Sequence, residues 1–436
     1  MKDFIMKLAI FSCMCIPILQ EGICQNENLE IISILIAALC SVILCMFKKE
    51  PYSLFKMFII FIAFFFCVAP IIQYKSDVRF FGTYFSNKDY FITSLYVLFI
   101  LISVLGLYLM FRRKFAKSIC KQVKLEEVAE IKTNKEFLLI FISASVCCYY
   151  LYINNFSIMS LLFRGGAFVD RINQGQITGL IVGNFIRPMP MIIFLCAYIM
   201  KVKHKIILPI LFILMIISSP PTGMARFSAA AMYIPVLLVM FPFLKKGYNL
   251  IFLIVIGLLV VFPFLDNFRH LSSGKEIGFN LNFDQFTELH FDSYSMFMRV
   301  LKDDVITFGR QLLGVIFFFV PRAIWPDKPE GSGHFMMNSM GSDFTNVSMP
   351  YFGEGYINFG FLGVILFIIL ISYVMAKLDA NYWNCVTDNN SINQIRYFML
   401  LGLLVFILRG DMMSSCAFTC GFISSFYVIR WIIIHK

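Results

Sequence analysis

The chain alternates long apolar runs with short polar connections, and this pattern predicts a membrane protein built from helices. A helix that crosses a bilayer needs about 20 mostly apolar residues, and about twelve runs approach or reach that length. The expected spans are residues 4–20, 31–47, 54–73, 91–111, 137–153, 178–200, 206–220, 227–244, 249–265, 356–376, 395–410 and 414–434. We therefore expect an all-α, polytopic integral membrane protein with a single membrane domain over residues 1–436.

Among the connections that follow odd-numbered spans, two are longer than the rest and are expected to carry function. Residues 266–355, between the ninth and tenth expected spans, are acidic on balance and long enough to build a cap. Within them, residues 312–320 are apolar but too few to cross a bilayer, so they are expected to form an interfacial or re-entrant segment at the membrane surface. Residues 154–177 form the second long loop.

Positive charge orients these spans. Connections rich in lysine and arginine follow even-numbered spans, at residues 48–49, 112–135, 201–205 and 245–246. Because cytoplasmic loops carry the excess of positive charge, both termini are expected in the cytoplasm and both long loops on the outer face. The first span is alternatively a cleaved signal peptide, since Lys2 and Lys7 precede a short apolar run.

Composition excludes the soluble fold classes and several kinds of partner. Hydrophobic residues make up 59% of the chain, charged residues 14%, and the mean hydropathy is +0.80, values typical of polytopic membrane proteins. The net charge of +11 lies in short loops, where it acts as a topology signal at an anionic leaflet, so no nucleic-acid partner is expected. The thirteen cysteines show no metal-ligand or disulfide spacing, so no cofactor is expected.

Lysine and arginine are expected on opposite sides of the membrane. Most lysines fall on the cytoplasmic side, whereas most arginines fall on the outer side or within the membrane. A guanidinium is a permanently charged, planar fork that binds phosphate and carboxylate through two hydrogen bonds. The bias indicates a phosphorylated ligand on the outer face.

Two candidate arginine sites lie in or near the shorter outer loop. Arg164 and Arg171 accompany glycines up to Gly175, which let backbone N–H groups approach an anion. An ordinary turn with surface arginines is the alternative. Arg187 lies about two turns inside an expected span, where a charge is costly unless it faces a cavity or a partner. Snorkelling to the interface is the alternative there.

Three further candidates lie in or beyond the longer loop. Arg322 begins a proline-stiffened segment, residues 321–333, that is suited to a lid over a lipid headgroup. Glu354 lies between two glycines at the mouth of the tenth expected span, where it is either a helix cap or a general base. Arg409-Gly410-Asp411 occupies a tight turn between the last two spans, where an ion pair that holds the turn is the alternative to a site.

These segments resemble those of the Wzy-type O-antigen polymerases. The resemblance rests on residues 353–360 (GEGYINFG), residues 321–329 (PRAIWPDKP) and Arg409-Gly410-Asp411. Members of that family have many membrane spans, cytoplasmic termini and two enlarged periplasmic loops, each with an arginine followed by a glycine after ten intervening residues. Arg164 with Gly175 and Arg322 with Gly333 match that spacing in the two long loops. The resemblance implies a protein of the bacterial inner membrane.

The resemblance also implies a reaction, in which a glycosyltransferase moves a growing glycan from undecaprenyl pyrophosphate to a hydroxyl of an incoming lipid-linked repeat unit. Its partners would be the undecaprenyl-pyrophosphate-linked oligosaccharide, membrane lipid and a chain-length regulator protein. Such chemistry needs cations for the departing pyrophosphate and a base for the acceptor hydroxyl. The expected base is Glu354, with Asp411 second, and no Asp-rich cluster marks a metal site. The expected substrate-binding residues are Arg164, Arg171, Arg187, Arg322, Arg409, Gly175 and Gly333, with Arg226 and Arg310 in reserve.

Two rival functions stay open at this point. An O-antigen ligase uses a similar donor with another acceptor, and histidines in the long loop favour it: His270, His290 and His334. A flippase for the lipid-linked oligosaccharide would show repeat halves with polar residues through both leaflets, whereas the charges here gather near one face.

Overall fold

The computed structural model describes residues 2–20, 24–82, 84–118, 131–163, 171–172, 174–261, 283–384 and 391–435. No β-strand occurs among these residues, which hold only one isolated bridge, between Ile131 and Val202. The all-α prediction is confirmed. The chain divides into two discontinuous compact units: unit 1 comprises Met1–Lys121, Asn282–Asn384 and Ile407–Cys416, and unit 2 comprises Gln122–Leu281, Cys385–Phe406 and Ala417–Lys436.

The helices make this chain a multi-pass membrane protein. Eight segments of the described residues are long and apolar enough to cross a bilayer: Glu27–Leu44, Leu54–Lys75, Asn87–Phe115, Thr133–Ile153, Ile177–Ile199, Tyr351–Asn384, Ile392–Arg409 and Met412–Ile434. Four apolar helices are shorter: Phe4–Leu19, Ile207–Ser218, Arg226–Met240 and Asn249–Val261. Every expected span coincides with one of these twelve segments, but twelve crossings stay a prediction because the shorter helices fall below the usual length.

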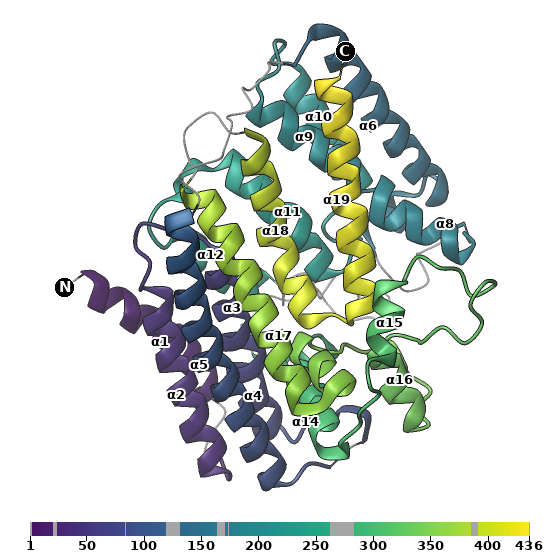
Figure 1. Cartoon of the computed structure of the whole chain (residues 1–436). Helices are drawn as coiled ribbons and strands as arrows, with labels where there is room; N and C mark the ends of the chain where they lie inside the picture. The colour runs from purple at the N-terminus through teal and green to yellow at the C-terminus, as the bar shows by residue number, and fades with distance from the viewer. Residues whose placement is uncertain are drawn as a thin grey trace. The chain divides into compact units, whose positions relative to one another are not determined.

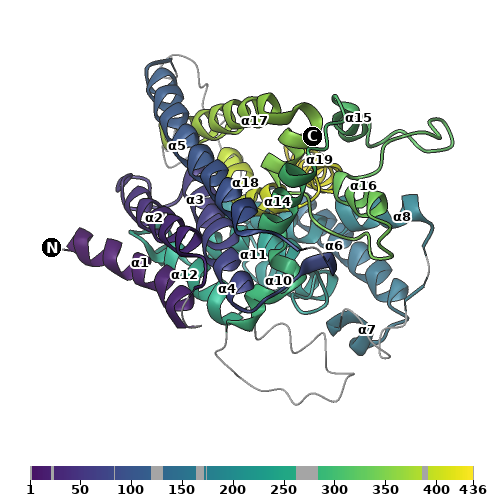
Figure 2. The ribbon, with the colours of Figure 1, turned by 90° about the horizontal axis from the view of Figure 1, so that it is seen from below.

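Unit 1 is a helical bundle in which α5 runs beside α2 and α17 (Figures 1 and 2). Its helices are α1 (Lys2–Gln20), α2 (Glu27–Leu44), α3 (Leu54–Ala63), α4 (Ala69–Lys75), α5 (Asn87–Ser118), α14 (Ser293–Asp303), α15 (Arg310–Ile316), α16 (Ser332–Ser339) and α17 (Tyr351–Asn384). A π-helical turn, Phe64–Val68, joins α3 to α4, and 3-10 turns lie at Phe80–Gly82, Asp284–Thr287 and Leu289–Phe291.

Unit 2 contains the remaining helices. They are α6 (Thr133–Ile153), α7 (Ile158–Leu162), α8 (Gln176–Ile181), α9 (Met189–Ile199), α10 (Ile207–Ser218), α11 (Arg226–Met240) and α12 (Asn249–Ile256), with π turns at Val182–Ile186 and Gly257–Val261 and a 3-10 turn at Pro242–Lys245. α18 (Ser391–Arg409) and α19 (Met412–Ile434) belong mostly to unit 2, but the turn that joins them belongs to unit 1.

A buried carboxylate holds the start of α3. The first backbone N–H groups of a helix have no partner within the helix, and here Asp379 of α17 accepts from two of them, Leu54 N at 2.9 Å and Phe55 N at 3.2 Å. The Ser53 hydroxyl accepts from the third, and the Tyr108 hydroxyl donates to Asp379 at 2.9 Å. Asp379 is fully buried, so these bonds join α3, α5 and α17 at one end of unit 1.

That end of unit 1 carries exposed positive charge. Lys48 and Lys49 follow α2, and Arg113 and Lys114 lie near the end of α5, all of them exposed. We call it the lysine end. The second part of α17 runs from Gly360 down to Asp379 at the lysine end, so Gly360 lies at the opposite end of unit 1.

α17 is a helical hairpin, not the continuous helix that the apolar run over residues 356–376 predicts. Helical geometry breaks at Phe359 and at Gly360, where φ is +61° and ψ is −146°, a conformation that favours glycine. Tyr351 Oη donates to the carbonyl oxygen of Phe367 at 3.3 Å, and their ring centroids are 4.9 Å apart. A continuous helix would separate these residues by about 24 Å. The first arm, residues 351–358, therefore runs antiparallel to the second, residues 361–384.

The two arms touch through their backbones at a pair of glycines. A Cβ atom added to Gly363 would lie 1.8 Å from the carbonyl oxygen of Gly355. We expect Gly363→Ala to lower the free energy of unfolding by about 1–3 kcal/mol or more, measured as a lower thermal midpoint of the purified protein in lipid nanodiscs. Gly106→Ala in α5 is the matched control, because its Cβ would meet no described atom within 4 Å. Equal midpoints for the two variants would contradict the hairpin.

Candidate functional site

Glu354 and Asp411 come together at the hairpin, and we call the pair with its immediate partners the carboxylate site. Glu354 lies on the first arm, six residues before Gly360, and therefore about 9 Å from the turn toward the lysine end. Its side chain is fully buried. The fold of α17 thus carries a carboxylate into the bundle instead of leaving it at the mouth of a straight helix.

Glu354 joins the N-termini of two other helices. Its Oε2 accepts a hydrogen bond from the Ser332 hydroxyl at 2.6 Å, and its Oε1 accepts from Met412 N at 2.9 Å. Ser332 is the first residue of α16 and Met412 the first of α19. The partial positive charge of helix N-termini stabilises a carboxylate in this position.

Asp411 bridges the same two helices. Its Oδ1 caps α19 by accepting from Met413 N at 3.0 Å and Ser414 N at 3.4 Å, and its Oδ2 accepts from Gly333 N at 3.0 Å. The side chain is half-buried. Burial raises the pKa of Asp411 above the usual range of an aspartate, although the backbone N–H groups oppose this. Asp411 is thus the partly accessible member of the pair.

Arg409 ties the carboxylate site to the start of α14. Its Nε donates to the carbonyl oxygen of His290 and its Nη2 to that of Leu289, both at 3.0 Å. Nη2 also lies 3.2 Å from Oδ1 of Asp292, whose side chain is almost fully buried. The Ser348 hydroxyl and backbone N–H both donate to Asp292. Arg409 therefore fixes the segment before α14, and its described donors already face protein acceptors.

Two cations lie on the loop that leads into Gly331 and α16. Arg322 is exposed and donates from Nη1 to the carbonyl oxygen of Lys328 at 2.7 Å. Lys328 Nζ donates to the carbonyl oxygens of Phe318 and Val320. Partial burial, and then the nearby Arg322 charge, lower the pKa of Lys328. We call residues 318–330 the cation loop.

The cation loop packs against the carboxylate site. A Cβ atom added to Gly314 would lie 2.9 Å from Met413 Cε and 3.0 Å from Pro329 Cβ, so α15, the loop and the start of α19 meet there. Large apolar side chains around the loop are exposed, a pattern typical of a membrane or partner surface. They are Phe308, Leu313, Ile316, Phe317, Phe319 and Ile324. That residues 312–320 lie at a membrane surface stays a prediction.

The structure places the other predicted residues in unit 2, or does not describe them. Arg164 lies outside the described residues. Arg171 donates to Asn154 Oδ1 at 2.9 Å and to the carbonyl oxygens of Ser160 and Phe163, so it holds its own loop together. Gly175 precedes α8 as its N-cap.

Arg187 lies between α9 and its neighbours in unit 2. Its Nε donates to the carbonyl oxygen of Ser218 at 3.2 Å, and its guanidinium lies 4.7 Å from the centre of the Tyr150 ring. Its Nη2 is buried and has no hydrogen-bond partner among the described residues. The functional interpretation of Arg187 stays a prediction.

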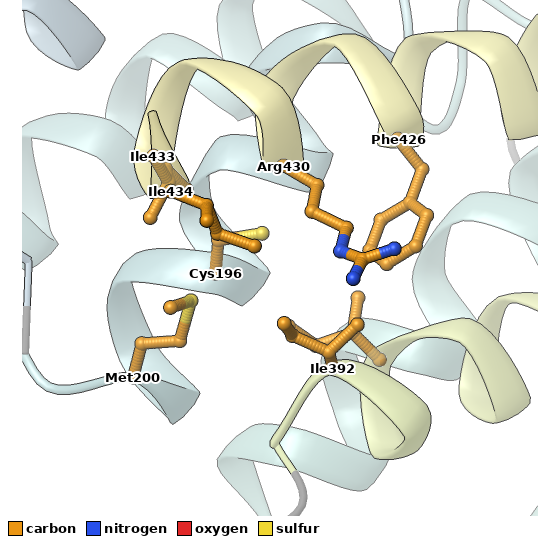
Figure 3. Close-up of a pocket in the computed structure, with 8 residues that line it drawn as sticks. Cys196, Met200, Ile392, Phe426, Arg430, Ile433 and Ile434 are labelled. Atoms are coloured by element: carbon orange, nitrogen blue, oxygen red, sulfur yellow. The ribbon is translucent and has the colours of Figure 1, made fainter. Parts of the chain in front are cut away.

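Unit 2 also holds a small crevice between α9, α18 and α19, shown in Figure 3. The Arg430 side chain extends between Phe426 and Ile392, and the other walls are apolar, including Cys196 and Met200. A small crevice with mostly apolar walls suits side-chain packing or a lipid tail and offers few hydrogen-bonding groups to a polar substrate.

Sequence reasoning found Glu354, Asp411, Gly333, Arg322 and Arg409, which all lie in the part of unit 1 around the carboxylate site. It missed Ser332, although its position between Gly331 and Gly333 was a usable signal, because short Gly-Ser-Gly segments let side chains and backbone approach closely. It also missed Asp292, which no local pattern distinguishes. No protein-family model, curated protein or solved structure matches this chain.

Proposed function

We propose that this protein is a membrane glycosyltransferase that polymerises oligosaccharide repeat units carried on a lipid pyrophosphate, with undecaprenyl pyrophosphate as the carrier. One observation carries the proposal: the partly accessible Asp411 lies beside a loop with two cations and an exposed apolar surface. A base, cations and a lipid-facing surface are the three things that such a transfer needs.

Asp411 acts as the general base in this proposal. It takes the proton from the acceptor hydroxyl, whose oxygen forms a bond to the anomeric carbon of the donor as the bond from that carbon to pyrophosphate breaks. The pyrophosphate leaves on its lipid with the electron pair. A base positioned in this way contributes about 10²–10⁴-fold to a rate. The raised pKa of Asp411 makes its carboxylate a better proton acceptor than an exposed aspartate.

Arg322 and Lys328 offset the charge of the departing pyrophosphate. Arg322 has four further N–H donors beyond its bond to Lys328, and its planar fork fits phosphate oxygens. The carrier chain lies along the exposed apolar side chains beside the cation loop. This leaves Arg409 and Glu354 as positioning residues, because Arg409 faces protein acceptors and Glu354 is fully buried. The roles of Glu354 and Asp411 as first and second choice of base are therefore exchanged.

The proposed location is the inner membrane of a bacterium. The carboxylate site lies toward the end of unit 1 opposite the lysine end, and cytoplasmic ends carry the excess of positive charge. The site therefore faces the periplasm. Both termini are proposed to lie in the cytoplasm because the connections rich in positive charge follow even-numbered expected spans. The chain-length regulator protein stays a proposed partner.

The proposal is tested by adding undecaprenyl-pyrophosphate-linked repeat units to the purified protein in nanodiscs. We expect a ladder of lipid-linked oligomers without any nucleotide sugar. In cells that lack the gene, we expect lipid-linked single units transferred to the surface acceptor and no ladder. Accumulated lipid-linked polymer without transfer would identify a ligase, and unpolymerised units held on the cytoplasmic side would identify a flippase. Either result would overturn the proposal.

Within the same assay, Arg322→Ala is expected to slow chain extension by about 10- to 100-fold, below the effect of a fully buried oxyanion donor because the loop is exposed. Arg322→Lys keeps the charge but loses the fork, so it restores only part of the rate. Arg113→Ala removes an exposed arginine at the lysine end and is the matched control. Equal rates for Arg322→Ala and Arg113→Ala would remove the cation loop from the mechanism.

A further inference from the structure

A cavity of about 410 Å³ opens in unit 1, between the end of α4, the connection that follows it and the start of α5. These elements lie at the end opposite the lysine end, where α4 finishes and α5 begins. Among the residues that line the cavity are Gln25, Tyr74, Arg79, Tyr84 and Asn87. None of them belongs to the carboxylate site or the cation loop.

The charges in this cavity are already matched by the protein. Arg79 forms two hydrogen bonds to the Asp77 carboxylate, at 3.1 and 3.0 Å. Lys75 Nζ donates to the carbonyl oxygen of Ile18 at 2.6 Å and lies 3.9 Å from Glu30. Each of these cations is paired with a carboxylate, whereas Arg322 and Lys328 of the cation loop have no carboxylate partner among the described residues. A site for phosphate needs cations whose charge is not already offset. The cavity therefore favours a ligand without strong charge.

The remaining groups are aromatic rings and planar amides. Tyr84 is 68% exposed, and Arg79 lies 5.5 Å from the centre of its ring. The Tyr74 hydroxyl donates to Asn87 Oδ1 at 3.0 Å, and the two donors of the Asn87 amide have no partner among the described residues. The exposed Gln25 side chain makes no hydrogen bond to any described residue. An exposed ring with amide donors and acceptors around it suits a sugar ring, which has C–H faces and a rim of hydroxyl groups.

We propose that this cavity binds an oligosaccharide segment, as a glycan site separate from the carboxylate site. That the oligosaccharide is part of the growing or incoming glycan rests on the proposed function. The polar lining excludes an acyl chain, and the matched charges exclude a pyrophosphate. The growing glycan would therefore be held here by its sugars, while its lipid end lies at the cation loop.

α14 connects the cavity to the carboxylate site. Lys302, near the end of α14, donates to the carbonyl oxygen of Tyr84 at 2.8 Å and lies 3.6 Å from Asp89 at the start of α5. Asp292, just before α14, is the partner of Arg409. Ten residues of helix cover about 15 Å, a distance that a short oligosaccharide bridges. The cavity thus lies within reach of a glycan whose reacting end is at Asp411.

The test measures binding and polymerisation separately. The probe is the lipid-free oligosaccharide that mild acid releases from the lipid-linked donors of the source cells, titrated by calorimetry into the full-length protein in nanodiscs. Tyr84→Ala and Asn87→Ala are expected to weaken binding by about three- to tenfold each, as expected for the loss of one aromatic or hydrogen-bonding contact. Lys88→Ala, an adjacent exposed residue outside the cavity lining, is the control.

The outcomes separate this inference from the proposed function. Unchanged binding in Tyr84→Ala, or no binding by a wild-type protein that still polymerises, would overturn the cavity site and leave the polymerase proposal standing. Binding that depends on Tyr84 in a protein that makes no ladder would support the cavity site and overturn the polymerase proposal. Photo-crosslinking from position 84 that captures a protein instead of a glycan would identify a protein-docking surface and overturn the inference.

Discussion

Asp411→Asn is expected to lower the rate of chain extension by about 10²–10⁴-fold, the usual contribution of a general base. The asparagine retains a side-chain oxygen that caps α19 as Asp411 Oδ1 does, but its amide cannot accept the proton of the acceptor hydroxyl. The measurement is the rate of ladder formation by purified protein in nanodiscs, at equal amounts of folded protein.

Two further variants distinguish the proposed role of Asp411 as a base from its role as a helix cap. Asp411→Ser also caps a helix well and is expected to be as inactive as Asp411→Asn. Asn26→Ala removes a cap elsewhere in unit 1, since the Asn26 side chain accepts from Leu29 N at the start of α2. It should cost about 1 kcal/mol of stability and keep full activity. An active Asp411→Ser variant would show that Asp411 is only a cap.

The proposed role of Asp411 as a base also predicts the direction in which the wild-type rate changes with pH. The base works only when it is ionised, so the rate rises with pH through the pKa of Asp411. Because burial raises that pKa, the acid limb lies at higher pH than an exposed aspartate would give. The linked effect on folding has the opposite direction: the folded state holds the Asp411 proton more tightly, so this group favours folding as the pH falls through the same range. If the residual rate of Asp411→Asn falls at low pH in the same way as the wild-type rate, this pH dependence belongs to another group.

Arg409→Ala is expected to lower the free energy of unfolding by about 3–5 kcal/mol, because it leaves the buried Asp292 carboxylate without its cation. The readout is the thermal midpoint in nanodiscs, followed by the rate of ladder formation in whatever protein remains folded. Ser348 still donates to Asp292 in the variant, which keeps the loss toward the lower end of this range.

A double-mutant cycle tests whether the two charges act as a pair. Arg409→Met combined with Asp292→Asn removes both charges, and its loss of stability should be smaller than the sum of the two single losses. Losses that simply add would mean that Arg409 and Asp292 stabilise the fold independently. In that case Arg409 would regain its earlier interpretation as a residue that binds substrate.

The features that could be predicted from the sequence are those that depend on residues close together in the chain. Helix positions such as residues 137–153 and 414–434 were predictable, because hydropathy over a window of about 20 residues is a local property. Asp411 and Glu354 were chosen as candidates because both are carboxylates at the predicted outer membrane boundary, where a lipid headgroup would lie. Each signal could be read within a few turns of chain.

What could not be predicted depends on contacts between distant segments. The hairpin of α17 is specified by one backbone conformation at Gly360 and by the contact of Gly355 with Gly363, and hydropathy is the same for a straight and a folded helix. The proposed exchange of roles between Glu354 and Asp411 rests on the full burial of Glu354, which a single sequence does not show. Asp292 lies 117 residues from Arg409, and no pattern within either segment indicates that they meet.

The bond from Asp379 to the start of α3 sets an order for biogenesis. The N–H groups of Leu54 and Phe55 depend on a carboxylate 325 and 324 residues further along the chain. Until Asp379 has been translated, these N–H groups at the lysine end can bond only to water or lipid headgroups, so the start of α3 cannot be buried in the bundle without leaving them unpaired. A premature stop codon before Asp379 would leave that state permanent. Truncated chains should therefore be marked for removal by membrane proteases even when all of α1 to α5 has been inserted.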